Sequence, residues 1–390
     1  MITDNVKNAQ KRHVGIYIHV PFCRSKCYYC DFCSKTRATD EQIGRYVDAL
    51  CAEIKFISER IKDSGNELPI ADTVYFGGGT PTLLDPKSFE RALRSVSDSF
   101  GICDSAEITA EANPKTADLH KLCDMRNLGI NRLSIGMQSV HGAELRALGR
   151  AHSFEDFCAV YKDARRAGFD NVSADLMYGI PDQTSESFEV SVKTLADMSP
   201  EHISSYCLTV EEGTTFDRCR HKLNLPDEDA VADMYSMMSD TLSKQGYGKY
   251  EISNFAHKGY ESRHNIKYWR LDDYFGFGSA AHSYFDGVRF AHTRDIESYI
   301  SGENTYCEVC SIQRREAMNE YVMLGMRLAD GINISDFEAR FGENFENCFG
   351  AKLKKYAPEH VYMDKNVCRL TPKGMFVSNF ILSDVLDFGD

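Results

Sequence analysis

The stretch VGIYIHVPFCRSKCYYCDF, residues 14–32, decides how the rest of the chain is interpreted. Within it Cys23, Cys27 and Cys30 form a C-x-x-x-C-x-x-C run directly after a β-prone segment, residues 15–20. A zinc site needs four ligands, usually in two pairs, and no second pair lies at a fitting distance. Three close thiolates suit an iron–sulfur cluster that keeps one iron free of protein ligands. The alternative is three structural cysteines near a strand end, which the spacing and the strand context disfavour.

With Tyr29 just before the third cysteine, this run resembles that of the radical SAM superfamily. In that superfamily the open iron of a [4Fe–4S] cluster binds the amino and carboxylate groups of S-adenosylmethionine. One electron passed to the sulfonium then gives a 5′-deoxyadenosyl radical. The resemblance therefore implies that Cys23, Cys27 and Cys30 hold the cluster and that S-adenosylmethionine is a cofactor.

Composition limits the classes of protein that the chain can represent. The 390 residues can bury a large core. The net charge of −13 argues against a nucleic-acid-binding protein, which would show a basic face. No apolar run is long enough to span a bilayer, and residues 1–12 lack an apolar signal core. The other cysteines are mostly scattered singly, so we expect free thiols in a reducing cytoplasm.

Strand-like and helical segments alternate through the first half of the chain. This alternation predicts βαβ units and a parallel sheet. Right-handed crossovers would curl six units into a partial (β/α)6 barrel, an α/β, TIM-like fold whose curved sheet stays open. The expected strands are residues 15–20, 73–76, 107–110, 132–135, 172–177 and 202–210, and the expected helices are residues 43–57, 86–99, 117–128, 143–148, 154–167, 186–198 and 226–245.

The pattern changes in the last third of the chain. Residues 247–287 are rich in aromatics and glycine, without clear periodicity. Beyond residue 313, helical runs surround a short hairpin, which predicts a small, mostly helical, winged-helix-like domain. We therefore expect a radical SAM barrel over residues 1–245, a connecting segment over residues 246–310 and a C-terminal domain of the HemN type over residues 311–390.

Polar or glycine-rich motifs follow the predicted strands. The ends of parallel strands meet at one rim, where such sheets place their chemistry. Glycines in the turn GGGTP, residues 77–81, would let a ligand approach the backbone, although a tight strand-to-helix turn is the alternative. Glu111 could bind ribose hydroxyls or be solvated surface. Gln138, Arg150 and Asp175 add polar groups, and Arg150 would suit a carboxylate of methionine or of a porphyrin propionate.

Several motifs, in order, resemble the family of oxygen-independent coproporphyrinogen III oxidase and its relatives. They are YIHVPFC (residues 17–23), GGGTP, EANP (111–114), RLSIGMQS (132–139) and DLMYGIP (175–181). The resemblance implies S-adenosylmethionine contacts from two groups of residues. The first is Tyr17, Gly78 and Glu111, and the second, which in the oxidase serves a second S-adenosylmethionine, is Tyr29, Gly79, Thr80, Gln138, Arg150 and Asp175.

Three features resemble the HemW branch, the heme-binding chaperones of this family, more than the oxidase. The oxidase has a fourth cysteine two residues after the third, where this chain has Phe32. Cys33 breaks the oxidase spacing but could still lie near the cluster. Only a short segment precedes Cys23, whereas the oxidase has a longer N-terminal extension. The sequence HNIKYW, residues 264–269, resembles the HNxxYW motif of HemW proteins.

His264 in this motif is the candidate heme ligand, because a neutral imidazole is a standard axial ligand of heme iron. Tyr268 and Trp269, the single tryptophan, could cover a flat macrocycle. A hydrogen-bonded packing role for His264 is the alternative.

We therefore predict a cytoplasmic radical SAM protein that binds heme and delivers it to a heme-requiring protein. Cleavage of S-adenosylmethionine with an electron donor is expected. The resemblance leaves open a homodimer, the acceptor and whether heme is attached covalently. One alternative is an oxidase-like enzyme that decarboxylates porphyrinogen propionates through the same radical. Another is a radical SAM enzyme with an unrelated substrate.

Overall fold

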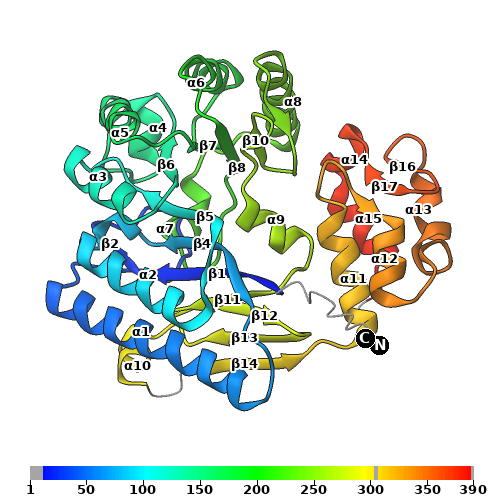
Figure 1. The fold of residues 1–390 in the computed structure, drawn as a ribbon. Coiled ribbons are helices and arrows are strands. Elements are labelled where there is room, and N and C mark those ends of the chain that lie inside the picture. The colour runs from blue at the N-terminus through cyan, green and yellow to red at the C-terminus, as the bar shows by residue number, and fades with distance from the viewer. Residues whose placement is uncertain (1–11, 303–305, 388–390) are drawn as a thin grey trace, which may run out of the picture.

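A single large sheet organises most of the molecule (Figure 1). The computed structural model describes residues 12–302 and 306–387, so the outermost residues of the first and last predicted domains and three residues of the connecting segment lie outside it. In spatial order the strands are β14 (Tyr306–Ser311), β13 (Val288–His292), β12 (His282–Phe285), β11 (Tyr274–Phe277), β1 (His13–Val20), β4 (Ile70–Gly78), β5 (Ile102–Ala112), β6 (Arg132–Gln138), β7 (Val172–Tyr178), β8 (His202–Cys207), β10 (Asn254–Ala256) and β9 (Gly248–Lys249).

The centre of this sheet is parallel, which confirms the predicted α/β architecture. Six strands pair in parallel, in the order β1, β4, β5, β6, β7 and β8. They are the strands of the six βα units that the sequence predicted. A seventh parallel strand, β11, joins the free edge of β1. In the described part of the chain no strand pairing closes the curved sheet into a complete barrel.

Helices cover the outer face of the parallel strands (Figure 1). Their apolar faces pack on the sheet, and in all of them but α4 (Gly142–Ala147) a polar side chain at the preceding residue accepts from one of the first backbone N–H groups. Thr39 with Gln42 forms a capping box before the first helix, and Asp85 caps the second. The helices are α1 (Asp40–Asp63), α2 (Pro86–Phe100), α3 (Leu119–Asn127), α4 (Gly142–Ala147), α5 (Phe154–Arg166), α6 (Ser185–Asp197) and α8 (Glu228–Lys244).

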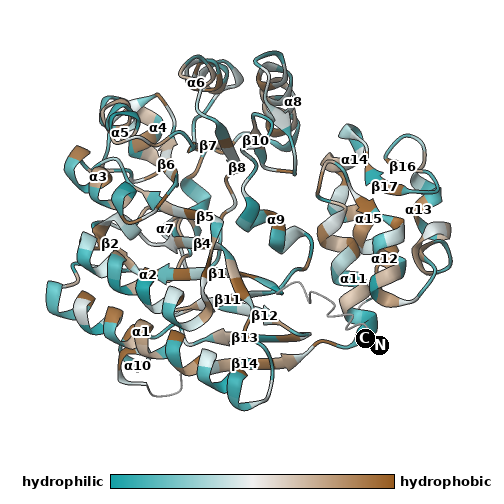
Figure 2. Ribbon diagram, in the orientation of Figure 1, coloured by the Kyte–Doolittle hydropathy of each residue, from teal (hydrophilic) through white to brown (hydrophobic). Residues whose placement is uncertain are grey.

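The two faces of the parallel strands differ in polarity. Alternate residues of a strand point to opposite faces. In β6, Leu133, Ile135 and Met137 belong to the apolar core, whereas Arg132, Ser134 and Gln138 line an internal cavity. The apolar residues therefore fill the layer between sheet and helices, where Figure 2 shows brown strands under helices of mixed colour. The inner face is left polar and available for ligands.

Residues 247–287, for which the sequence predicted no regular element, extend the sheet on both sides of its parallel centre. They form β9, β10, β11 and β12 and a short helix, α9 (Arg263–Trp269). Figure 1 shows α9 between the sheet and the C-terminal part of the chain. The strands have only two to four residues each, too few for a visible alternation of apolar and polar positions.

The C-terminal residues build a second hydrophobic core around Val322, Phe337 and Phe349. We propose a domain boundary near residue 311, between this core and that of the large sheet. The last segment of the C-terminal part forms two helices that meet at Val377. The elements are α11 (Arg314–Gly325), β15 (Ile332–Asn333), α12 (Ile334–Phe341), a π-helical turn (Glu346–Gly350), α13 (Ala351–Leu353), β16 (Val361–Met363), β17 (Val367–Leu370), α14 (Pro372–Phe376) and α15 (Ser378–Val385).

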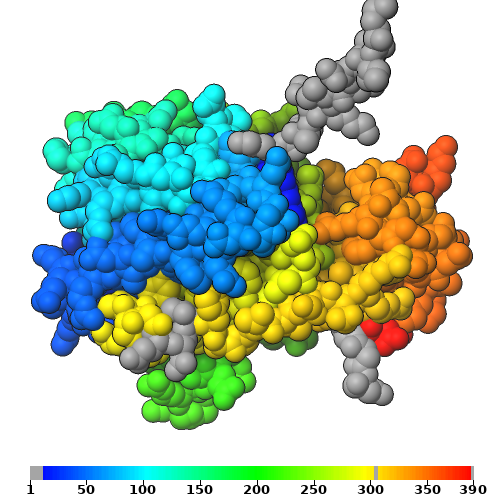
Figure 3. All heavy atoms as spheres, turned by 60° about the horizontal axis from the view of Figure 1, so that its bottom comes forward, coloured from blue at the N-terminus to red at the C-terminus, as the bar shows by residue number. Residues whose placement is uncertain are grey.

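The C-terminal unit packs against the barrel, as the orange and yellow surfaces of Figure 3 show. The Arg289 guanidinium makes two hydrogen bonds to the Glu320 carboxylate, at 2.8 and 2.6 Å, and so joins β13 to α11. Arg340 of α12 donates to the backbone oxygen of Arg270, directly after α9, at 3.1 Å. Trp269 of α9 lies under the guanidinium of Arg327. The short helix α9 therefore contacts both parts of the molecule.

Candidate cofactor-binding site

The cysteine loop lies at the carboxyl end of β1, over the open mouth of the inner cavity. It runs between two short paired strands, β2 (Phe22–Cys23) and β3 (Lys35–Thr36). The backbone of Tyr28 in this loop accepts a hydrogen bond from the N–H of Phe216, and its own N–H donates to the backbone oxygen of Leu148. The loop is therefore held to two elements distant in sequence.

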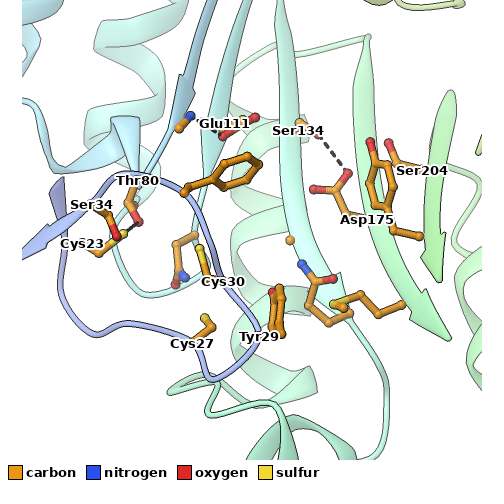
Figure 4. Close-up of a pocket in the computed structure, with 18 of the residues that line it drawn as sticks. Cys23, Cys27, Tyr29, Cys30, Ser34, Thr80, Glu111, Ser134, Asp175 and Ser204 are labelled. Atoms are coloured by element: carbon orange, nitrogen blue, oxygen red, sulfur yellow. Dashed lines mark hydrogen bonds between the residues drawn. The ribbon is translucent and has the colours of Figure 1, made fainter. Parts of the chain in front are cut away.

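The three predicted cluster ligands line one cavity of about 560 Å³ (Figure 4). Two polar groups lie beside their sulfurs. The Thr80 hydroxyl is 3.6 Å from Sγ of Cys23, and Nη1 of Arg150 is 3.4 Å from Sγ of Cys27. Burial raises the pKa of Cys23 and of Cys30, and the nearby Cys27 adds to both shifts. Binding of a metal by these thiols would therefore release protons.

The cysteine arrangement fits a [4Fe–4S] cluster with three protein ligands. In the described residues no three His, Cys, Asp or Glu side chains converge as ligands of a single metal ion. A cluster spreads its thiolate ligands over several irons, so its cysteines do not have to meet at one point. The Arg150 guanidinium and the Thr80 hydroxyl would then donate to the bound thiolates.

Cys33 lies apart from these three cysteines. Its Sγ donates to the backbone oxygen of Arg294 at 3.0 Å, and its own backbone oxygen lies 2.9 Å from Nε2 of His19. It is not among the residues that line the cavity. The structure thus directs the fourth nearby thiol away from the other three.

The triple-glycine turn presses against the start of the cysteine loop. A Cβ on Gly79 would lie 2.7 Å from the backbone oxygen of Phe22 and 2.8 Å from that of Val20. Gly78 has a φ of +109° and donates its N–H to Oε2 of Glu111 at 3.1 Å. Only glycine permits this close approach and this backbone angle. The turn is therefore both a tight connection and one wall of the cavity.

Glu111 and Asp175 face each other inside the cavity (Figure 4). Glu111 accepts a hydrogen bond from the Tyr75 hydroxyl at 3.0 Å, and Asp175 accepts one from the Ser134 hydroxyl at 3.0 Å. Burial, followed by the charge of Asp175, raises the pKa of Glu111 to about 7. Burial also raises the pKa of Asp175. Glu111 can therefore bind hydroxyl or amino groups in either protonation state near neutral pH.

Most residues predicted to bind S-adenosylmethionine line this cavity. Gln138 does so from a strained position, with a φ of +68° at the end of β6. Tyr17 does not belong to the lining, and its hydroxyl lies 3.1 Å from Nδ1 of His19. The lining residues among those predicted are Tyr29, Gly78, Gly79, Thr80, Glu111, Gln138, Arg150 and Asp175.

His264 is also outside the lining of this cavity. Its ring is 1% exposed and lies at the amino-terminal ends of the strands. Nδ1 is 2.8 Å from the Thr73 hydroxyl, and Nε2 is 2.8 Å from the Tyr268 hydroxyl. Burial, followed by the charge of Lys267, lowers the pKa of His264 to about 3, so the imidazole is neutral. The structure thus places this candidate heme ligand in a buried, fully hydrogen-bonded position.

The helix that carries His264, α9, is held against β5 and β4 of the parallel sheet. Both carboxylate oxygens of Glu107 accept hydrogen bonds from the first backbone N–H groups of α9, those of Arg263 and His264. Lys267 forms a 2.9 Å ion pair with Asp72. Gly15 leaves room for the helix, since a Cβ there would lie 3.0 Å from Cδ of Lys267.

Several lining residues were not predicted as site residues. Their common signal is the period of two along each parallel strand, which places every second side chain on the inner face. Asn265 has no such signal, because α9 was not predicted. The additional polar lining residues on the inner face are Arg132, Ser134, Ser204, Tyr206 and Asn265.

Comparisons with known proteins agree with this geometry. Residues 17–195 match the family model of the radical SAM superfamily, and residues 312–377 match that of the HemN C-terminal domain. The protein named heme chaperone HemW from Lactococcus lactis is 32% identical over 380 residues, which is 95% of this chain and 97% of that protein. The protein of the same name from Bacillus subtilis is 33% identical over 378 residues, 95% of this chain and 98% of that protein.

The chain belongs to the HemW family of radical SAM proteins. A solved structure described as coproporphyrinogen III oxidase (HemN) from Escherichia coli superposes with a TM-score of 0.82, over 97% of this chain and 91% of that one. At 24% identity this likeness confirms the fold. Membership of the radical SAM superfamily implies a [4Fe–4S] cluster and S-adenosylmethionine. When bound, the cluster supplies the electron that cleaves the sulfonium.

Within the residues described, no helix is both long and apolar enough to cross a membrane.

Proposed function

We propose that this HemW-family protein binds heme and delivers it to a heme-requiring acceptor protein. The observation that carries the proposal is the likeness, over about 95% of the chain, to proteins named heme chaperone HemW. The proposed cofactors are a [4Fe–4S] cluster on Cys23, Cys27 and Cys30, with S-adenosylmethionine on the cavity residues above. The proposed partners are heme, the acceptor and an electron donor in the cytoplasm.

The cysteine loop supports this proposal over an oxidase. Phe32 stands where the oxidase has a fourth cysteine, and its ring is 63% exposed at the edge of the cavity. Cys33 does not replace that cysteine, because its thiol is bonded to the Arg294 carbonyl. An exposed aromatic ring beside the mouth offers a surface for a flat apolar ligand.

Two assays on the same preparation test the proposal. Hemin titrated into anaerobically reconstituted protein should bind in a saturable one-to-one manner, followed by its absorption spectrum. Coproporphyrinogen III with S-adenosylmethionine and a reductant should give no protoporphyrinogen. Steady formation of protoporphyrinogen would instead establish the oxidase alternative, and the absence of saturable hemin binding would exclude the chaperone function.

His264 remains the proposed heme ligand, and its geometry defines a specific test. Iron coordination through Nε2 requires the Tyr268 hydroxyl to release that nitrogen. If His264 is the ligand, Tyr268→Phe should strengthen hemin binding and His264→Ala should change the heme spectrum. If His264 only anchors α9, both variants should lower the stability of the fold, and the heme spectrum should stay that of the wild type.

A further inference from the structure

Arg132 contributes a guanidinium to the floor of the cavity. Arg132 is the first residue of β6 and is 2% exposed. It belongs to the lining of the cavity, and its Nε atom has no hydrogen-bond acceptor among the described residues. A buried charged group that lacks hydrogen bonds is unfavourable, so such groups are normally paired. The position of Arg132 indicates a partner that the chain itself does not provide.

The two carboxyl groups near Arg132 already have other partners. Glu111 accepts hydrogen bonds from Tyr75 and from the backbone of Gly78, and Asp175 accepts one from Ser134. These bonds hold the Glu111 carboxyl group to β4 and the Asp175 carboxyl group to β6. Neither of them forms an ion pair with Arg132 within 4 Å in the described structure, although both lie close enough to influence it electrostatically.

Asn265 brings a second unused polar group to the same cavity. It follows His264 on α9, and it lines the cavity although His264 does not. The contacts of His264 with Thr73 and Tyr268 fix the helix, so the position of Asn265 is also fixed. Its backbone N–H donates to the Ser262 hydroxyl, while no described residue bonds its side-chain amide.

We propose that Arg132 and Asn265 form a carboxylate-binding subsite at the floor of the cavity, which receives an acidic group of the substrate. A guanidinium matches a carboxylate through two parallel hydrogen bonds, and an amide can add a third. Under the proposed function, on which this inference rests for the identity of the ligand, the acidic group is a propionate of heme.

The floor is separate from the part of the cavity beside the cysteines. Arg132 and Gln138 are the two ends of β6, which corresponds to roughly 20 Å of strand. Arg150, the guanidinium proposed for the methionyl carboxylate, lies beside Cys27 at the other end. Two cations at opposite ends of one cavity indicate two different acidic groups, of which only one belongs to S-adenosylmethionine.

Hemin and its dimethyl ester provide the test, because they differ only at the two propionates, whose charge the methyl esters remove. Wild-type protein should bind hemin about tenfold or more tightly than the ester, as expected for a charge-assisted pair. In Arg132→Gln this preference should fall to near one. Asn265→Asp should weaken hemin binding and leave ester binding unchanged. Because Asn265 is less buried than Arg132, this second variant is expected to fold even if Arg132→Gln does not. The control Arg94→Gln removes an exposed arginine of α2 and should keep the preference.

A second pair of ligands separates the subsite from the cofactor site. S-adenosylmethionine and its decarboxylated analogue should be distinguished equally well by wild type and by Arg132→Gln. If Arg132→Gln and Asn265→Asp both keep the preference for hemin over its ester, the floor subsite is refuted while heme binding stands. If Arg132→Gln instead loses the distinction between the two nucleosides, Arg132 belongs to the cofactor site and the inference is wrong. If wild type binds neither tetrapyrrole, the proposed function itself fails.

Discussion

The guanidinium of Arg150 lies 3.4 Å from the sulfur of Cys27, although the two residues are 123 positions apart in the chain. A second contact, 3.3 Å from Nη2 to the backbone oxygen of Gly136, fixes the side chain at the end of β6. The cation therefore lies beside one of the proposed cluster thiolates, and we propose that it also binds the carboxylate of S-adenosylmethionine. Charge-assisted hydrogen bonds of this kind contribute about 1.5–3 kcal/mol.

We expect Arg150→Gln to weaken S-adenosylmethionine binding by about tenfold or more, since that bond to the carboxylate is lost. Isothermal titration of the reconstituted protein would measure the change. The iron content should stay close to that of the wild type, because three cysteines remain. An unchanged dissociation constant would remove Arg150 from the cofactor site, and Arg94→Gln serves as the matched surface control.

Cys33→Ser should retain the cluster, whereas Cys30→Ser should not. The reason is that the Cys33 thiol faces the Arg294 carbonyl, outside the cavity that Cys30 lines. Iron and acid-labile sulfide per chain, measured after anaerobic reconstitution, should be near the wild-type values in the first variant and strongly reduced in the second. Equal losses in both variants would show that Cys33 moves to the cluster when it assembles.

Gly79→Ala should lower cluster content without unfolding the protein. The new Cβ would lie 2.7 Å from the backbone oxygen of Phe22, so the strand that leads into the cysteine loop has to shift. We expect less than half of the wild-type iron per chain. Gly44→Ala is the matched control, because no atom lies within 4 Å of its added Cβ on α1. That control should keep its iron and gain about 1 kcal/mol of stability.

The pKa of Glu111 predicts a pH-dependent contribution to stability. Burial raises this pKa from 4.5 to about 7, so the folded protein binds the proton more tightly than the unfolded chain. Between these two pH values the folded state holds more protons, and the contribution to the free energy of unfolding therefore falls as the pH rises. The stabilising effect of the proton is complete below pH 4.5 and is lost above about pH 7.

Denaturant unfolding of wild type and Glu111→Gln at pH 5 and pH 8 tests this prediction. Glutamine is uncharged, like the protonated carboxyl group, and its amide oxygen can accept from the Gly78 N–H, so the variant should be close to the wild type in stability at pH 5. At pH 8 the wild type has lost the stabilising effect of the proton. The difference in free energy of unfolding between the two proteins should therefore shift in favour of Glu111→Gln by on the order of 2 kcal/mol. Parallel curves at both pH values would show that Glu111 does not titrate in this range.

Gly15→Val should loosen α9 from the barrel. A Cβ at Gly15 already meets Cδ of Lys267 at 3.0 Å and Cε1 of His264 at 3.3 Å, so the two further methyl groups of valine cannot fit. Overpacking of this kind costs about 1–3 kcal/mol. Hydrogen exchange should become faster at the backbone N–H groups of Arg263 and His264, which Glu107 holds in the wild type. Unchanged protection of these two N–H groups would contradict the close packing of α9 against β1 at Gly15.

The sequence by itself determined the cysteine loop, the six βα units and most of the residues at the cavity. These features depend on local chemistry. The spacing of Cys23, Cys27 and Cys30 limits the metal centre, and a strand of seven residues such as β6 shows its alternation in the sequence. Because parallel strands place their carboxyl ends together, Gly78, Glu111 and Gln138 could be assigned to one rim in advance.

Only the tertiary structure decided where the segments after residue 246 belong. β11 has four residues and pairs with β1, some 260 positions earlier, and α9 has seven residues that lie between the sheet and the C-terminal part of the chain. Such short elements carry too little periodicity to be recognised, and their position depends on contacts with distant residues such as Glu107 and Thr73. The same long-range packing turned His264 away from the cavity and Asn265 toward it, which a motif in the sequence cannot show.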